Sequence, residues 1–187
     1  MTIVFFGDSI TDVEYRDMWD PREQFSCYAL IVAERVKEHV IAKGVPGETV
    51  NGLVRRLGPD VLAHEPTLVS ILIGVNDAYQ ESEGGADAEA FERSYRLILE
   101  RIAAAGARIV LMEPFLVGDE YWRPGVDSRI AVVRRLAREF GAALVPADGI
   151  MNAAACRERV TRDGVHPNAR GDAVLAEAWI RYAGLGG

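Results

Sequence analysis

The sequence predicts an α/β fold in which a parallel β-sheet is covered by helices on both faces. Short apolar runs rich in β-branched residues alternate with longer segments of helical periodicity. A strand that is apolar on both faces is typical of a parallel sheet buried between two helical layers. These features favour a three-layer α/β/α sandwich. The runs expected to form its five strands are residues 2–6, 39–43, 67–73, 107–112 and 142–146.

Between these runs, apolar residues recur at the three- and four-residue spacing of amphipathic helices. Gly58-Pro59 interrupts the second helical pattern and predicts a kink or break there, because proline removes a helix hydrogen bond. The expected helical stripes lie within residues 25–36, 50–57, 91–102, 130–140 and 174–179.

Length and composition predict a single domain over residues 1–187. With 49% hydrophobic residues, this length is enough to build one full core. The net charge of −7 argues against nucleic acid or an anionic membrane as a partner, since either would require a basic surface. A neutral or cationic small molecule fits better, and the sequence is compatible with a homo-oligomer.

Targeting and cysteine signals are sparse. The first strand begins at residue 2 without a signal-peptide pattern, and no apolar stretch has transmembrane length, so a cytoplasmic location is expected. Cys27 and Cys156 are expected to be free thiols. Neither has a neighbouring Cys or His at metal-ligand spacing, so no zinc site is expected there.

A candidate nucleophile stands at the exit of the first predicted strand. Ser9 follows Gly7-Asp8, directly behind the apolar run 3–6. A serine hydroxyl needs a base within hydrogen-bond reach, usually a histidine that a carboxylate orients. Asp163 and His166 supply such a pair near the other end of the chain. A tight turn can fold the carboxylate onto Nδ1–H of His166 and leave Nε2 free to take a proton from Ser9.

Two further positions follow the second and third predicted strands and can donate hydrogen bonds to a developing oxyanion. Gly47 lacks a side chain, so its N–H can approach a ligand closely, although a glycine after Pro46 is also what a type II turn requires. Asn76 carries a side-chain amide that can donate. Ligands of open parallel sheets bind beyond the carboxyl ends of the strands, which favours a functional role for both.

The segments around Ser9, Gly47, Asn76 and His166 follow one another in this order along the chain. In this the chain resembles the SGNH (GDSL-type) hydrolases, whose name lists Ser, Gly, Asn and His. The resemblance implies Ser9 as nucleophile, Asp163 and His166 as the other triad members, and Ser9, Gly47 and Asn76 as oxyanion donors. It also implies the flavodoxin-like strand order 2-1-3-4-5. Five segments of the sequence are most similar to those of small serine carbohydrate esterases, including acetylxylan esterases. These segments are GDSITD, KGVPGETV, SILIGVNDAY, MEPF and RDGVHP. Many relatives carry Asn where this chain has Ala42.

These observations predict a serine esterase that hydrolyses short-chain esters, acetyl esters of carbohydrates among them, through an acyl-enzyme. The reaction requires no cofactor and no metal. The chain has no long insertion that would serve as an apolar lid, which favours short, soluble acyl groups. Side chains on loops near the predicted site are candidates for the substrate pocket. Most of them lie on the loops that follow the third and fourth predicted strands. The candidates are Asp12, Trp19, Tyr79, Phe115, Tyr121 and Trp122.

Three alternative functions remain open from the sequence. One is a lysophospholipase- or thioesterase-type acyl hydrolase. Another is a metal-dependent phosphoesterase with Asp8, Asn76, Asp163 and His166 as ligands, which has few histidines for that chemistry and leaves Ser9 without a role. The third is a carbohydrate-binding protein that kept the fold and lost turnover, against which the intact Ser9, Asp163 and His166 argue.

Overall fold

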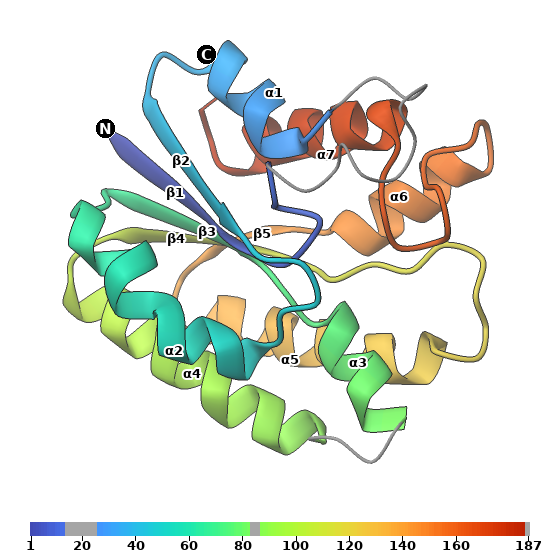
Figure 1. The fold of residues 1–187 in the computed structure, drawn as a ribbon, viewed down its shortest axis with the longest axis horizontal. Coiled ribbons are helices and arrows are strands. Elements are labelled where there is room, and N and C mark those ends of the chain that lie inside the picture. The colour runs from blue at the N-terminus through green and yellow to red at the C-terminus, as the bar shows by residue number, and fades with distance from the viewer. Residues whose placement is uncertain (14–25, 83–86, 186–187) are drawn as a thin grey trace.

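A computed structural model of the chain describes residues 1–13, 26–82 and 87–185. Its centre is a five-stranded sheet in the order β2-β1-β3-β4-β5, and every neighbouring pair is parallel. This confirms the predicted sheet, its strand order and the α/β/α layers (Figure 1). The strands are β1 Thr2–Gly7, β2 His39–Gly44, β3 Leu68–Leu72, β4 Arg108–Met112 and β5 Ala143–Val145.

Helices cover both faces of the sheet. On one face α1 packs against α7, which also contacts α6, while α2, α4 and α5 lie on the other, where α3 contacts α5 (Figure 1). The helices are α1 Tyr28–Arg35, α2 Val50–Asp60, α3 Val75–Ser82, α4 Ala88–Ala104, α5 Arg123–Glu139, α6 Ala147–Ala155 and α7 Ala169–Tyr182, with a 3-10 turn, η2, at Leu62–His64.

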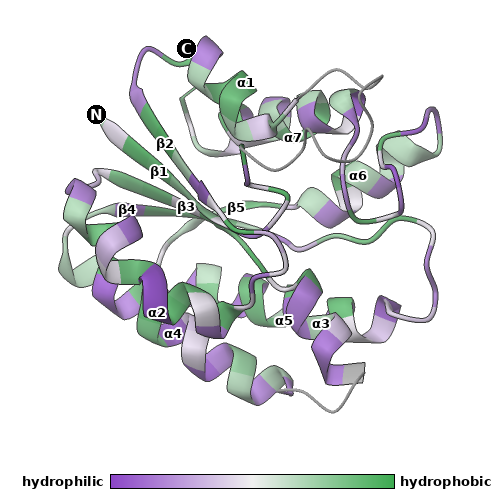
Figure 2. Cartoon of the chain, in the orientation of Figure 1, coloured by the Kyte–Doolittle hydropathy of each residue, from purple (hydrophilic) through white to green (hydrophobic). Residues whose placement is uncertain are grey.

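The apolar run of β1 explains why both layers are needed. Ile3 and Phe5 belong to the core cluster beneath α1 and α7, whereas Val4 and Phe6 belong to the cluster beneath α2 and α4. All four are completely buried, because successive side chains of a strand point to opposite faces. Figure 2 shows the same hydrophobic character along the central strands.

Trp179 anchors α7 to the sheet. Its ring lies 4.8 Å from that of Phe5, and its Nε1–H donates to Ser70 Oγ on β3 at 2.8 Å. A buried indole N–H needs such a partner, and Ser70 supplies it in an otherwise apolar strand. This contact fixes the helix that follows the His166 loop.

The structure differs from the sequence prediction in three helices. Helix α2 runs through Pro59 and ends at Asp60, so the expected break comes two residues later than Gly58-Pro59. Proline is tolerated there because only the last turn loses a hydrogen bond. Helices α3 and α6 were not expected, because Asn76-Asp77 resembles a turn and α6 directly follows a short strand.

The described residues also include both cysteines. Cys27 is buried, Cys156 is exposed, and the two do not form a disulfide with each other. Within residues 1–13, 26–82 and 87–185, no helix combines the length and apolar character needed to cross a bilayer.

Gly44 is predicted to be required by close packing at the end of β2. A Cβ atom there would lie 2.1 Å from the backbone nitrogen of Asp12, so Gly44→Ala should lower the free energy of unfolding by about 1–3 kcal/mol or more. Gly149→Ala in α6 is the control, since its Cβ meets no atom within 4 Å and should stabilise by about 0.4–1 kcal/mol. Urea denaturation of both variants measures the difference. Equal stability of the two would contradict the predicted clash.

Candidate active site

The candidate site lies where β1, β2 and β3 end. Ser9 is in the turn after β1, Gly47 is in the loop between β2 and α2, and Asn76 is in the first turn of α3, just beyond β3. The three strands are parallel neighbours, so their carboxyl ends meet at one edge of the sheet (Figure 1). The structure thus brings together three positions that are far apart in the sequence.

The turn that presents Ser9 is closed by backbone hydrogen bonds. The N–H groups of Thr11 and Asp12 both donate to the carbonyl of Asp8 at 3.1 Å. The Asp8 side chain is buried and its Oδ1 accepts the N–H of Ile10 at 3.0 Å. Asp8 therefore closes the turn that contains Ser9 by bonding to the three residues that follow Ser9.

His166 and Asp163 reach this turn from the chain segment before α7. Ser9 Oγ lies 3.0 Å from Nε2 of His166, and Nδ1 of the same ring lies 2.7 Å from Asp163 Oδ2. Because a carboxylate only accepts, Nδ1 carries the proton and Nε2 can accept from the Ser9 hydroxyl. The three side chains form a continuous hydrogen-bonded chain.

Asp163 is held in its ionised form. Partial burial opposes ionisation, but hydrogen bonds from the His166 ring and from the backbone N–H groups of His166 and Val165 outweigh it. Together they keep the pKa of the Asp163 carboxyl well below its usual range. The ionised carboxylate is an acceptor for the Nδ1–H group of His166.

The segment that carries Asp163 and His166 is a small closed turn. The N–H of Arg162 donates to the carbonyl of His166 at 2.8 Å, next to an antiparallel bridge between Thr161 and Pro167. The N–H of Val117 donates to the carbonyl of Gly164 at 2.9 Å and links the turn to the segment after β4. Local backbone bonds therefore set the orientation of the pair.

Gly47 lies in the loop after β2, and Asn76 of α3 bonds to the same loop. Gly47 has φ +73°, a conformation that favours glycine, and a Cβ there would meet no atom within 4 Å. Asn76 Nδ2 donates to the carbonyl of Glu48 at 2.9 Å, which leaves the second hydrogen of the amide for another acceptor. Gly47 has a backbone N–H and Asn76 a second amide hydrogen, each able to donate a hydrogen bond.

Arg56 of α2 cross-links this loop to β1. Its guanidinium donates to Glu48 Oε2 at 3.0 Å and to the carbonyl of Gly7 at 3.2 Å, and it lies 5.0 Å from the centre of the Phe6 ring. The loop of Gly47 and the turn of Ser9 are therefore held to the same side chain.

Asp77, which the sequence did not indicate as a site residue, directly follows Asn76 in α3. Its carboxylate oxygens accept the N–H of Val50 at 3.1 and 3.2 Å, at the start of α2. Burial raises the pKa of Asp77 to about 6, although the Val50 N–H and the positive charge of Arg129 lower it. The sequence Gly74-Val75-Asn76-Asp77 shows an acidic residue next to Asn76. Its burial could not be predicted, because it depends on helices that come together only in the folded protein.

A pocket of about 260 Å³ opens beside Asn76 and His166. Tyr79 and Trp122 form an aromatic wall, with ring centroids 5.0 Å apart at 62°. Tyr79 was expected on a loop but belongs to helix α3. The lining residues are Val75, Asn76, Tyr79, Trp122, Asp163, Val165 and His166.

The remaining pocket candidates lie elsewhere or beyond the described residues. Phe115 is completely buried in the core, because the chain after β4 turns inward, and Asp12 is also buried, in the turn after Ser9. Tyr121 is 80% exposed and is not among the lining residues. Trp19 lies outside the described residues. Val75 and Val165, which sequence reasoning missed, flank Asn76 and His166 in the chain.

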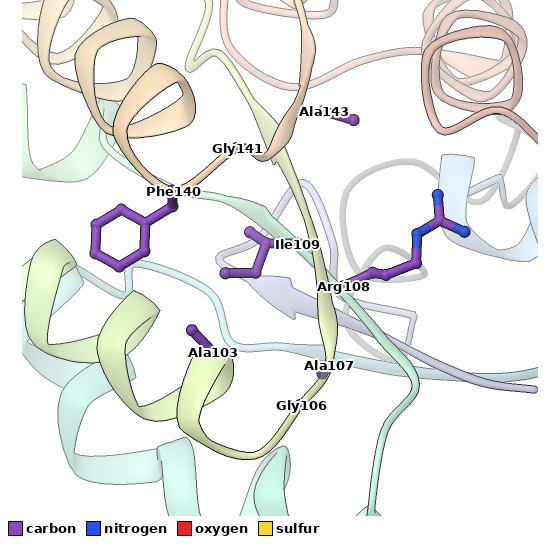
Figure 3. A pocket seen from close by; sticks show the side chains of 8 residues that line it. All are labelled: Ala103, Gly106, Ala107, Arg108, Ile109, Phe140, Gly141 and Ala143. Atoms are coloured by element: carbon purple, nitrogen blue, oxygen red, sulfur yellow. The ribbon is translucent and has the colours of Figure 1, made fainter.

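A second pocket of about 360 Å³ lies at the opposite edge of the sheet, where β4 and β5 begin and α4 and α5 end (Figure 3). Gly106, Phe140 and Gly141 form part of its wall. Its titratable lining residue is Arg108, which extends away from Phe140 and donates to the carbonyl of Ala183 at 3.1 Å. None of the described residues that line this pocket is a nucleophile or a general base.

The described part of the chain contains no group of three or more His, Cys, Asp or Glu side chains arranged to hold a metal ion. Asp163 and His166 are instead bonded to each other, and Nε2 of His166 faces Ser9.

Comparison with known proteins relates this geometry to acyl hydrolases. The model of the GDSL-like lipase/acylhydrolase family matches residues 5–174. An acetylxylan esterase from Geobacillus stearothermophilus is 28% identical over 98% of this chain and 94% of its own length. An uncharacterized lipoprotein from Bacillus subtilis is 30% identical over 59% of this chain and 46% of its own.

Solved structures agree with these matches. A GDSL-like protein from Parabacteroides merdae superimposes with a TM-score of 0.88 at 32% identity, over 98% of this chain and 95% of its own. The acetylxylan esterase Axe2 from Geobacillus stearothermophilus gives a TM-score of 0.84 at 27% identity, over 98% and 94%. Further Axe2 structures are of catalytic mutants in which an aspartate, a serine or a histidine is replaced by alanine.

The raised pKa of Asp77 predicts a pH-dependent loss of stability. A carboxyl whose pKa is higher in the folded state stabilises the fold below its unfolded pKa, and this contribution is lost as the pH rises through about 6. Between pH 4 and pH 8 the loss should be on the order of 3 kcal/mol relative to Asp77→Asn. Urea denaturation of both proteins across this range measures it, and parallel pH profiles would contradict it.

Proposed function

The chain belongs to the GDSL-like lipase/acylhydrolase family and is a carboxylic ester hydrolase, and we propose that it cleaves short acyl esters, chiefly acetyl esters of carbohydrates, through an acyl-enzyme on Ser9. The observation that carries this proposal is the 3.0 Å contact between Ser9 Oγ and His166 Nε2. It joins a nucleophile to a base that Asp163 already orients.

In the first half-reaction, Ser9 Oγ attacks the ester carbonyl while its proton passes to Nε2 of His166. Asp163 stabilises the imidazolium through the 2.7 Å bond to Nδ1. The tetrahedral intermediate then collapses, and the imidazolium gives its proton to the departing alcohol oxygen. The acyl group remains bonded to Ser9.

In the second half-reaction, water replaces the alcohol. His166 takes a proton from the water, which attacks the acyl carbonyl and forms a second tetrahedral intermediate. Its collapse releases the acid and returns the proton to Ser9. No cofactor enters either half-reaction.

The oxyanion of both intermediates is stabilised by the N–H groups of Ser9 and Gly47 and by the Asn76 side chain. The unobstructed space beside Gly47 supports this role, as does the amide hydrogen of Asn76 that is not committed to Glu48. Removing one such donor typically costs about 2.7–4 kcal/mol of transition-state stabilisation.

The Axe2 variants support the triad. The aspartate and histidine replaced in its catalytic mutants are three residues apart, as Asp163 and His166 are, and the third mutant replaces a serine. A family resemblance over nearly the whole chain makes equivalent roles the natural assignment.

The pocket and the relatives together support an acetylated carbohydrate as substrate. A pocket of about 260 Å³ has room for a sugar ring beside the acyl group. Tyr79 and Trp122 offer aromatic surface against which the C–H face of a sugar can pack. A homo-oligomer, the absence of nucleic-acid binding and a cytoplasmic location stay predictions from the sequence.

Replacing members of the triad should abolish turnover without unfolding the protein. Ser9→Ala removes the nucleophile and should lower kcat for an aryl acetate by several orders of magnitude, given a loss of about 10⁶ in a comparable triad. Asp163→Asn, which leaves the imidazole in the wrong tautomer, should lower kcat by up to about 10⁴. A fluorophosphonate probe followed by mass spectrometry should place the adduct on Ser9.

Ser94→Ala is the matched control, since Ser94 lies on α4 and its hydroxyl donates to Asn51. Its kcat and labelling should equal those of the wild type. An adduct on a serine other than Ser9, or near wild-type turnover in Asp163→Asn, would refute the triad.

The aromatic wall should determine preference for a sugar. Tyr79→Ala and Trp122→Ala should raise KM for acetylated xylo-oligosaccharides, while kcat/KM for an aryl acetate changes less because the aryl ester does not need the wall. Tyr121→Ala is the control, because this neighbouring aromatic residue is exposed and does not line the pocket. Steady-state kinetics on both substrates provide the comparison.

The same assay tests acyl length. Turnover should be fastest with acetyl or propionyl esters and fall for longer chains. A preference for acyl chains of eight or more carbons would instead favour a lysophospholipase or thioesterase. In the preceding experiment, equal effects of all three aromatic variants would show that Tyr79 and Trp122 do not bind the substrate.

A further inference from the structure

Two consecutive side chains of α3 hold the loop that carries Gly47. Asn76 Nδ2 donates to the carbonyl of Glu48 at 2.9 Å, and the carboxylate of Asp77 accepts the N–H of Val50 at 3.1 and 3.2 Å. The two bonds fall on either side of Thr49, immediately after Gly47. The end of this loop is thus attached at two points to the helix that follows β3.

The bond from Asp77 replaces a cap that α2 does not make for itself. Thr49 occupies the N-cap position of α2, but its side chain makes no capping hydrogen bond. The first N–H groups of a helix have no partner within the helix and must find one elsewhere. Here a carboxylate from another element supplies it, so the start of α2 is fixed relative to α3.

We propose that Asp77 is a positioning residue of the oxyanion site: by capping α2 at Val50, it holds the loop so that the N–H of Gly47 points where the negative oxygen forms. This proposal rests on the proposed function. Asp77 itself does not touch the substrate, because it is only 5% exposed and acts through Val50. It is therefore distinct from Asn76, whose amide donates directly.

The surroundings of Asp77 hold its backbone and set the charge near its carboxylate. The guanidinium of Arg129, completely buried on α5, donates to the backbone carbonyl of Asp77 at 3.3 Å and pairs with Glu81 of α3. Tyr95 of α4 is buried nearby, and the charge of Asp77 contributes to raising the pKa of its phenol. Glu48 adds negative charge from the loop side.

Burial of this carboxylate works against stability at neutral pH, as its raised pKa indicates. A strained or costly group is characteristic of functional sites. The capping bond at Val50 explains why the cost would be tolerated. A shift of about 1 Å in a catalytic donor can lower the rate by about 10².

The test compares Asp77→Ala and Asp77→Asn in the full-length chain with an aryl acetate as substrate. Asp77→Ala removes the cap and should lower kcat roughly 10- to 100-fold with little change in KM, because an oxyanion donor acts in the transition state. Asp77→Asn keeps an oxygen that can accept from Val50 and should recover most of the lost kcat.

Asp87→Ala is the matched control. Asp87 also accepts an N–H group of a first helical turn, that of Ala90 at 2.8 Å, but it is the N-cap residue of its own helix, α4, and does not cap α2. Asp87→Ala should lower the free energy of unfolding, as the loss of a helix cap does, and leave kcat unchanged. If Asp77→Ala keeps wild-type kcat, or if Asp87→Ala loses as much activity, the proposal is overturned.

Val50→Pro tests the same bond from its other end and protects the experiment against misfolding of Asp77→Ala. Proline lacks the N–H but suits the first position of a helix. Its kcat should fall like that of Asp77→Ala, and the double variant should lose no more than either single one. Additive losses would overturn the proposal.

Ser9→Ala in the same series separates the two hypotheses. If Ser9→Ala retains turnover, the proposed function fails whatever Asp77 does. If Ser9→Ala is inactive and Asp77→Ala behaves like the wild type, the function stands and only the positioning role fails.

Discussion

The candidate site depends on the parallel direction of β1, β2 and β3. Because the three strands run the same way, the chain leaves each of them at one edge of the sheet, and three short loops converge there. The fourth contribution comes from the far end of the sequence. His166 is brought to Ser9 because α7 packs on the sheet beside α1, and the buried contact of Trp179 with Ser70 and Phe5 fixes that helix. The residues of the candidate site are thus placed by the core, although Ser9 and His166 do not belong to it.

Close packing of the loops adds a second level of organisation. Gly44 lets the backbone after Ser9 approach the end of β2 to a distance that no side chain would permit. Arg56 then bonds to both sides of this junction, at the carbonyl of Gly7 and the side chain of Glu48. The turn of Ser9 and the loop of Gly47 are therefore held by the same side chain.

The sequence predicted the sheet well, because strands buried on both faces are continuous apolar runs, as residues 2–6 illustrate. It also indicated Ser9, Gly47, Asn76, Asp163 and His166, since each stands just after a strand or before a helix, and their order matches a known family. It could not indicate which aromatic residues reach the pocket. Phe115 and Trp122 both follow β4 in the chain, yet only the packing of α5 decides that the first is buried and the second exposed to the pocket. Asp77 was missed for a similar reason, because its partner Val50 is 27 residues away and belongs to another helix.

The closed turn around Asp163 and His166 has a consequence for motion. Its internal bonds, from the Asp163 carboxylate to two backbone N–H groups and from Arg162 to His166, span no more than four residues. Asp163 and His166 therefore belong to one short hydrogen-bonded turn, and a displacement of the whole turn would leave their mutual geometry intact. What such a displacement changes is the separation between Nε2 and Ser9 Oγ. In the proposed reaction, proton transfer therefore depends on how closely this one turn approaches Ser9 at the end of β1.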